Sequence, residues 1–240
     1  MLIIAYIVLV FTLIQLLVAL ANLVFETTLP GSAGASNDLV SVLVPARNEE
    51  KNIGNILDDL VNQGHRNIEV IIFNDQSEDR TAEIVTKYTI SDNRIRLVNS
   101  GGLPEGWLGK NFACHSLSEK ATGKYYLFLD ADVRIGNDLI SRAISFSVRH
   151  DLDLISIFPK QIIKSFGERI TIPNMNYILV SLLPLVLIRK TGYPSLSAAN
   201  GQFMFFRADT YAKMKPHEAV KSDRVEDISI ARIYKEAGKK

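Results

Sequence analysis

Two aspartates, Asp130 and Asp132, stand at the end of the apolar stretch "YYLFLD". Residues two apart in a strand point to the same face, so the two carboxylates converge if the extended conformation continues through Ala131. Carboxylates held close together repel each other unless a cation lies between them. Mg²⁺ and Mn²⁺ take oxygen ligands and commonly combine one or two carboxylates with substrate phosphates. A turn is the alternative, because aspartate is common where strands end, but the apolar strand in front of the pair favours a Mg²⁺ or Mn²⁺ site.

Polar residues also follow two other apolar stretches. "LVSVLV" runs into "PARNEE", and "IEVIIF" runs into "NDQSEDR". Asp75 in the second could accept hydrogen bonds from the N–H groups of a nucleotide base, or could cap the helix that follows. Asn48 and Glu49 in the first have the same two interpretations, a ligand pocket or a helix start, while Pro45 shapes the turn.

The acidic pair Glu226 and Asp227 opens a segment with helical spacing of apolar residues. Acids favour the positive end of a helix dipole, so their place there can be structural. One of them can instead be a general base, which must lie within hydrogen-bond reach of the proton that it removes. In "LPEGWLGKNFA", Lys110 either neutralises phosphate or is a solvated lysine, and Trp107 is either a core anchor or a wall over the ligand.

Alternating apolar and amphipathic stretches must position these residues. The pattern predicts strands at 39–44, 68–73, 95–98, 124–130 and 152–158 and helices at 50–63, 79–88, 109–121 and 137–150. A turn, a strand and a helix start follow at 196–214, and an amphipathic helix begins near 225. Strands that alternate with helices indicate βαβ units, hence an α/β fold with a mostly parallel sheet and helices on both faces. Ligands of such sheets bind beyond the carboxyl ends of the strands, where the candidate residues stand.

The first 25 residues contain no charged side chain. At 1.5 Å per residue in a helix, such a stretch is long enough to cross a hydrocarbon core of roughly 30 Å. The missing charged n-region and the length of the apolar run favour an uncleaved transmembrane anchor at 1–25 over a signal peptide. Residues 26–38, with Pro, Gly and Ser, are typical of a linker, and 39–240 are predicted to form one catalytic domain.

A second apolar segment, 172–188, is interrupted by Pro173 and Pro184 and is short for a membrane span. We expect it to lie at the membrane interface or to pack against an acceptor site. The first basic residue, Arg47, lies beyond the flank in which positive charge sets membrane orientation.

The composition excludes several classes. The 240 residues have a net charge of +1, which indicates no nucleic-acid partner. The single cysteine, Cys114, cannot form an intramolecular disulfide, so nothing requires an oxidising compartment. The 4 histidines show no metal-binding spacing.

Six stretches stand in an order that is similar to family-2 glycosyltransferases with the GT-A fold. They are "VSVLVPARNEE", "VIIFNDQSEDRT", "GWLGKNFA", "YYLFLDADVR", "NGQFMFFRADTY" and "VEDISIARIYKEAG", and they span roughly 39–238. "LPEGWLGK" and the N-terminal anchor most resemble the bacterial membrane-associated branch that glycosylates carotenoid or hopanoid-type lipids. The resemblance implies a Rossmann-like GT-A fold, here preceded by one transmembrane helix.

The resemblance also implies an activity and a set of roles. The activity is a metal-dependent, inverting transfer of a hexose-type sugar from a UDP-sugar to a hydroxyl or carboxyl of a lipid-like acceptor at the membrane. The nucleotide-sugar pocket would contain Pro45, Asn48, Glu49, Asp75, Lys110 and Asp130, with Asp75 on the uracil. Asp132, with Asp130, would hold Mg²⁺ or Mn²⁺. Asp227 of the Glu226–Asp227 pair would be the general base, and Trp107, Gly201 and Gln202 would belong to the acceptor and donor-sugar region.

Many relatives continue after the Glu-Asp helix with a Gln/Arg-X-X-Arg-Trp segment and further membrane helices, whereas this sequence ends at Lys240. We therefore expect either a truncated form or a compact relative. Two other functions stay open: a non-catalytic nucleotide-sugar-binding remnant without the acceptor region, and a nucleotidyltransferase, which would give no role to Glu226 and Asp227. Because nucleotide sugars are made in the cytoplasm, we expect a single-pass protein of the cell membrane with its catalytic domain on that side.

Overall fold

The computed structural model describes residues 1–25, 28–31, 34, 36–163 and 165–240, so the predicted linker at 26–38 lies partly outside the described residues. Contacts divide the chain into two compact units. The helical unit comprises 1–28 and 159–196, and the sheet unit comprises 29–158 and 197–240. Each is described by itself.

Six strands among the described residues form one sheet, in the order β3-β2-β1-β4-β6-β5. Their bounds are β1 Val40–Ala46, β2 Ile68–Asn74, β3 Ile95–Asn99, β4 Tyr125–Leu129, β5 Leu154–Ser156 and β6 Phe203–Arg207. The pairings β1–β2, β2–β3 and β1–β4 are parallel, whereas β6 runs antiparallel to both β4 and β5. The predicted mostly parallel sheet is therefore confirmed.

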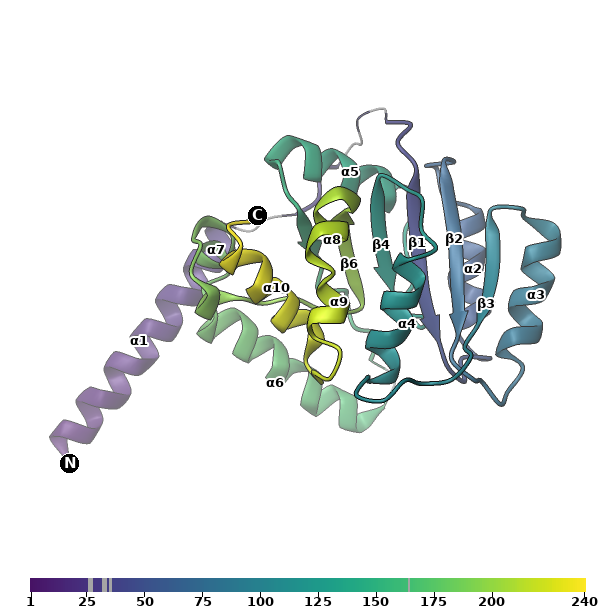
Figure 1. Ribbon diagram of the computed structural model, residues 1–240. Coiled ribbons are helices and arrows are strands. Elements are labelled where there is room, and N and C mark those ends of the chain that lie inside the picture. Colours follow the sequence, from purple (N-terminus) through teal and green to yellow (C-terminus); the bar gives the residue numbers. More distant parts are fainter. Residues whose placement is uncertain (26–27, 32–33, 35, 164) are drawn as a thin grey trace. The chain divides into compact units, whose positions relative to one another are not determined.

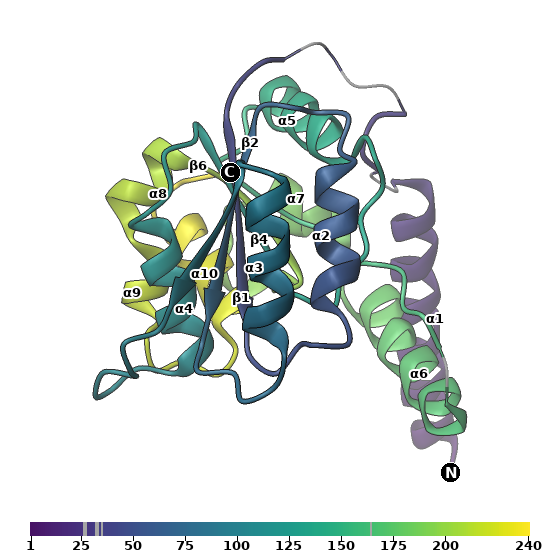
Figure 2. The same cartoon turned by 90° about the vertical axis from the view of Figure 1, so that its right-hand side faces the viewer.

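Helices cover both faces of this sheet (Figures 1 and 2). One face carries α2 (Ile53–Val61), α3 (Thr81–Ser91) and α5 (Leu139–His150), and the other carries α4 (Gly109–Ser118), α8 (Ala208–Met214), α9 (Pro216–Ala219) and α10 (Glu226–Glu236). The alternation of side chains in β1 explains the two cores. Val42 and Val44 pack with the first set of helices, and Leu43, between them, packs with the second.

The fifth predicted strand differs from the expectation. Of 152–158 only Leu154–Ser156 is a strand, and it pairs antiparallel with β6. The apolar stretch "FMFFR" of β6 takes the place beside β4, with Phe205 stacked on Tyr125 at 5.0 Å between ring centroids. β5 is the outermost strand on this side, and short edge strands offer few unpaired backbone groups to other chains.

The helical unit consists of α1 (Leu2–Val24), α6 (Phe166–Leu182), α7 (Leu185–Lys190) and the 3₁₀ turn Pro194–Leu196. The apolar segment 172–188 is thus split between two helices. Asn22 of α1 joins them: its Nδ2 donates to the carbonyls of Val180 and Leu183, both at 2.8 Å, and its Oδ1 accepts from Leu185 N–H at 2.8 Å. The side chain of Asn22 thereby satisfies backbone groups left free at the helix break.

By length and composition α1 can cross a membrane, with a mean hydropathy of 2.8, and it is the only helix of the described chain that meets both conditions. The placement of 172–188 at a membrane interface or an acceptor site stays a prediction.

Candidate active site

A cavity of about 370 Å³ opens at the carboxyl ends of β1, β2 and β4. Six residues singled out in the sequence line it: Pro45, Glu49, Asp75, Lys110, Asp130 and Asp132. Ala46, Arg47, Gly109, Ala113 and Ala131 complete the lining. The cavity lies where parallel strands end, as ligand sites of open α/β sheets do.

Asp75 occupies the β2 side of this cavity and is 7% exposed. Its backbone N–H donates to Ala46 O at 2.9 Å, and its Oδ2 lies 3.8 Å from Arg47 Nη1. Asp79, rather than Asp75, accepts the N–H of Thr81 at the start of α3. Asp75 therefore does not cap that helix, and its carboxylate faces the cavity.

Gly109 begins α4 directly against this carboxylate. A Cβ at this position would lie 3.0 Å from Asp75 Oδ2, closer than side chains normally approach. The absence of a side chain at Gly109 allows the first turn of α4 and Asp75 to line the same wall of the cavity.

Asp130 and Asp132 come together by a different local geometry from the one expected. The extended conformation ends at Leu129, and Val133 N–H donates to Asp130 O at 3.3 Å, which closes a turn. Both carboxyl groups nevertheless line the cavity, Asp130 half-buried and Asp132 exposed. Burial raises the pKa of Asp130; Lys110 opposes this rise, and the charges of Asp132 and Asp227 add to it. The pair is thus an electrostatically costly arrangement of acids.

Lys110 connects the two sides of the site. Its Nζ lies 2.9 Å from Asp130 Oδ1 and 3.3 Å from Glu226 Oε1. Burial works against its charged form, but the charge and hydrogen bond of Asp130 and the charge of Glu226 outweigh it and raise the Lys110 pKa. Gly201 allows this approach, because a Cβ there would lie 3.1 Å from Lys110 Nζ. Lys110 is therefore an ion-paired lysine rather than merely a solvated one.

Asp227 stands beside this pair in the first turn of α10. Its Oδ2 accepts the N–H of Gly201 at 2.9 Å, and its Oδ1 accepts the N–H of Ile228 at 2.8 Å. One oxygen is thus oriented by a backbone N–H of the turn before β6, which fixes the carboxylate relative to that strand.

Six predicted residues do not line the cavity: Gly201, Glu226 and Asp227, described above, and Asn48, Trp107 and Gln202. Asn48, with φ 56°, links the loop after β1 to the loop after β2: its Oδ1 accepts a hydrogen bond from Glu78 N–H at 2.9 Å. Trp107 packs on Phe112 and His115 of α4, with ring centroids 5.7 and 5.0 Å away. Gln202 supports the site through its backbone carbonyl, which accepts the N–H of Asp130 at 3.3 Å.

The sequence reasoning missed Arg47, Gly109 and Ala113 as lining residues. Arg47 lies inside the stretch "PARNEE", which directly follows a strand, and this position could have identified it as a lining residue. Gly109 and Ala113 carry no chemical group that a pattern could single out, and only the approach of α4 to the strand ends reveals them.

Divalent-cation chemistry fits the oxygen donors present. Two carboxylates facing one cavity, with room for phosphate oxygens, match the ligands that Mg²⁺ and Mn²⁺ take alongside substrate phosphates. Among the described residues no group of three or more His, Cys, Asp or Glu side chains is placed to hold an ion by itself. A cation held by Asp130 and Asp132 would therefore take its remaining ligands from substrate phosphates or water.

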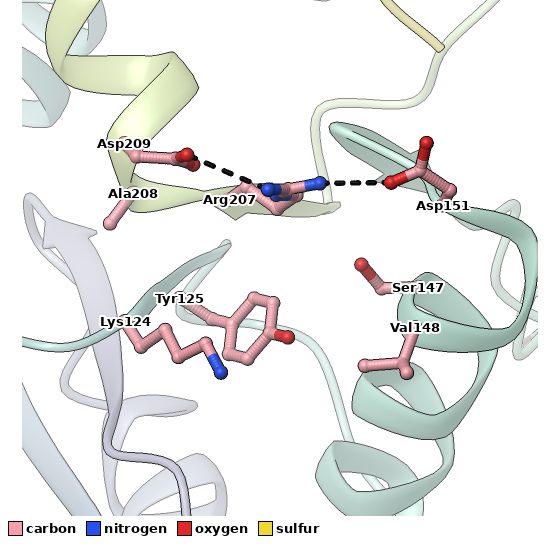
Figure 3. A pocket seen from close by; sticks show the side chains of 8 residues that line it. All are labelled: Lys124, Tyr125, Ser147, Val148, Asp151, Arg207, Ala208 and Asp209. Atoms are coloured by element: carbon pink, nitrogen blue, oxygen red, sulfur yellow. Dashed lines mark hydrogen bonds and ion pairs between the residues drawn. The ribbon is translucent and has the colours of Figure 1, made fainter.

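A larger cavity of about 460 Å³ lies at the opposite edge of the sheet, where β4 begins and β6 ends (Figure 3). Its charged side chains pair with one another or with a neighbour. Arg207 contacts Asp151 at 3.0 Å and Asp209 at 3.5 Å, and Lys124 contacts Asp38 at 3.1 Å. Because these charges are balanced, the larger cavity is a weaker candidate for the active site than the cavity lined by Asp75, Asp130 and Asp132.

The fold and the position of the site define a GT-A protein, and solved structures share the fold. The mannosyltransferase PcManGT from Pyrobaculum calidifontis, in complex with GDP-Man and Mn²⁺, aligns with a TM-score of 0.67 at 18% identity, over 92% of this chain and 59% of that one. TarS 1–349 from S. aureus, in complex with UDP, aligns with a TM-score of 0.55 at 21% identity, over 80% of this chain and 53% of that one.

The family model "Glycosyl transferase family 2" matches residues 41–214, and the chain belongs to this family. A 4,4'-diaponeurosporenoate glycosyltransferase from Staphylococcus haemolyticus is 27% identical over 209 residues, which are 84% of this chain and 52% of the relative. The enzyme of the same name from Staphylococcus aureus (strain USA300) is 32% identical over 131 residues, 54% of this chain and 34% of the relative. The predicted family is confirmed, and the chain spans about half the length of these curated relatives or less.

Proposed function

We propose that this protein is a membrane-anchored, metal-dependent glycosyltransferase that moves a sugar from a UDP-sugar to a lipid-like acceptor with inversion at the anomeric carbon. The observation that carries the proposal is one acid-rich cavity with Asp75 on one side and Asp130 and Asp132 on the other, next to the Lys110–Glu226 ion pair. The family match and the UDP and GDP-Man complexes of proteins with similar folds support it.

The donor would lie along the strand ends. The buried Asp75 carboxylate would accept the N–H of a uracil. Asp130, across the same cavity, would lie towards the ribose and the diphosphate. Asp132, with Asp130, would hold Mg²⁺ or Mn²⁺ against the diphosphate. A divalent cation stabilises the negative charge that develops on the leaving diphosphate.

The acceptor would approach from the side of α10. Asp227, oriented by Gly201 N–H, removes the proton of an acceptor hydroxyl as that oxygen attacks the anomeric carbon. Lys110 keeps its positive charge between Asp130 and Glu226 and lowers the repulsion among the acids. A single displacement of this kind inverts the configuration.

The names of the curated relatives support a carotenoid-type acceptor, and α1 supports a site of action at the membrane. We place the sheet unit on the cytoplasmic side, where UDP-sugars are made. The proposed linear organisation remains an anchor at 1–25, a linker at 26–38 and a catalytic domain at 39–240.

Calorimetry of UDP binding to the full chain in detergent, with and without Mn²⁺, tests the donor site. We expect Mn²⁺ to lower the Kd of UDP for the wild type. With Mn²⁺ present, Asp132→Asn should raise this Kd at least tenfold, or by about 1.4 kcal/mol in binding free energy. Asp138→Asn is a matched control, because Asp138 is an exposed acid that pairs with Arg142 outside the cavity.

Absence of UDP binding under both conditions would contradict the donor assignment. Binding of UDP without transfer to any lipid acceptor would favour the remnant, and pyrophosphate release from a nucleoside triphosphate would favour a nucleotidyltransferase.

A further inference from the structure

The first turn of α4 holds the loop that leads into α10. The N–H of Leu108 donates to Lys221 O at 2.8 Å. The side-chain amide of Asn111 donates to three carbonyls of the same loop: Val220 O at 2.8 Å, Asp223 O at 2.9 Å and Lys221 O at 3.3 Å. Asn111 is 1% exposed, so these carbonyls replace the water that the amide loses on burial.

The same loop is hydrogen-bonded to the start of α10. Asp223 accepts the N–H of Val225 on Oδ1 at 3.0 Å and the hydroxyl of Ser229 on Oδ2 at 2.5 Å. Glu226 and Asp227 stand between these two anchoring points. A continuous chain of hydrogen bonds therefore runs from Asn111 through Asp223 to the turn that carries the acidic pair.

Packing alone gives this turn little support. Val225, which precedes α10, is 51% exposed, and valine has no polar side-chain group that could cap the helix. Buried contacts of α10 begin at Ile230, one turn further on. The position of Glu226 and Asp227 thus depends on polar contacts at the start of the helix more than on the core.

We propose that Asn111 is a positioning residue for the acidic pair: it fixes the 220–227 segment against α4, so that Asp227 stands at the donor when the acceptor arrives. The inference rests on the proposed function. Lys110, the neighbouring residue, already contacts Asp130 and Glu226, so one turn of α4 sets the distance between the donor side and the base side. Reacting groups must stay within about 3–3.5 Å, and a shift of about 1 Å can cost roughly 100-fold in rate.

The test compares Asn111→Ala and the milder Asn111→Ser with the wild type, as full chains in detergent. We expect kcat for UDP release from UDP-glucose, with a hydroxyl-bearing lipid as acceptor, to fall at least tenfold in Asn111→Ala and less in Asn111→Ser. The Kd of UDP and the KM of the donor should stay within about threefold, because Asn111 does not line the cavity. Hydrogen exchange of the 220–229 backbone should accelerate, while that of β1 and β4 should not.

Ser147→Ala is the matched control. Ser147 is 3% exposed, and its hydroxyl donates to Leu152 O at 2.9 Å near the opposite edge of the sheet, so its loss removes a buried side-chain-to-backbone hydrogen bond away from the site. This variant should lose stability and keep kcat.

Unchanged kcat or unchanged exchange at 220–229 in Asn111→Ala would overturn the inference, as would a parallel loss of UDP affinity. If the wild-type protein transferred no sugar, the result would count against the proposed function instead. Hydrogen exchange of the 220–229 backbone would still decide whether Asn111 orders the loop.

Discussion

Acid should weaken the fold through His217, a buried histidine of α9. Its side chain is 2% exposed, its ring centroid lies 4.7 Å from that of Phe128, and its Nδ1 shares a 2.6 Å hydrogen bond with the hydroxyl of Tyr211. Burial, with the positive charges of Lys110 and His115, lowers the pKa of His217 to about 3. The folded protein therefore holds this imidazole neutral well below the pH at which an unfolded one is protonated.

The sign and size of the effect follow from linkage. The folded-state pKa is depressed, so the stability contributed by neutral His217 is full above the unfolded value of 6.5 and is lost as pH falls towards about 3. One pKa unit corresponds to about 1.4 kcal/mol, which makes the full loss roughly 5 kcal/mol. Of this, about 2 kcal/mol should be lost between pH 8 and pH 5, where only the unfolded chain takes up the proton.

Urea denaturation of the full chain in detergent at pH 8 and pH 5, followed by the fluorescence of Trp107, measures this loss. His217→Gln keeps a hydrogen-bonding side chain for Tyr211 but cannot titrate, so its free energy of unfolding should fall about 2 kcal/mol less than that of wild type between the two pH values. His150→Gln, at an exposed histidine, should behave as wild type. An equal fall in wild type and His217→Gln would refute the reasoning, because the acid sensitivity would then come from other groups.

Two further predictions concern ligands. Gly109→Ala should weaken UDP binding about tenfold, or roughly 1.4 kcal/mol, because the new Cβ would meet Asp75 Oδ2 at 3.0 Å. Its melting temperature should not fall, since alanine is the better helix former; unchanged UDP affinity would contradict the assigned wall. Asp227→Asn should slow transfer to a hydroxyl acceptor about 100- to 10,000-fold. It should spare a carboxyl acceptor, which is already ionised at pH 7, and equal initial rates for wild type and variant with a hydroxyl acceptor would remove Asp227 from the role of base.

The parallel part of the sheet could be predicted from the sequence because strand and helix periodicities alternate clearly from 39 to 150. The place of β6 could not, because no local pattern says that a strand runs antiparallel between β4 and β5. The pairing of Tyr125 with Arg207 joins residues 82 apart in the chain, and only packing decides it.

Some residues in and around the site could likewise be predicted from the sequence, and others could not. Asp75, Asp130 and Asp132 could be found because they directly follow strands of a parallel sheet, whose carboxyl ends share one edge. Asn111 could not, since a buried asparagine within a helical pattern looks like any solvated one until its partners at 220–223 are known. The turn at Asp130–Val133 was named as an alternative but not favoured, because the alternating pattern of "LDADVR" also suits an extended strand.

The antiparallel insertion of β6 also has a consequence for synthesis on the ribosome. β4 pairs with β1 as soon as both have emerged, but its other edge stays open until β6 arrives. Roughly 70 residues separate the two strands, which at about 5–20 residues per second is a delay of roughly 4–15 s. During that interval the nascent chain exposes the edge of "YYLFL", a hazard for pairing with other chains. The cavity wall with Asp75, Asp130 and Asp132 can thus form well before Gly201, Glu226 and Asp227 are synthesised. Under the proposed function, a nascent chain would bind the donor before it could transfer the sugar.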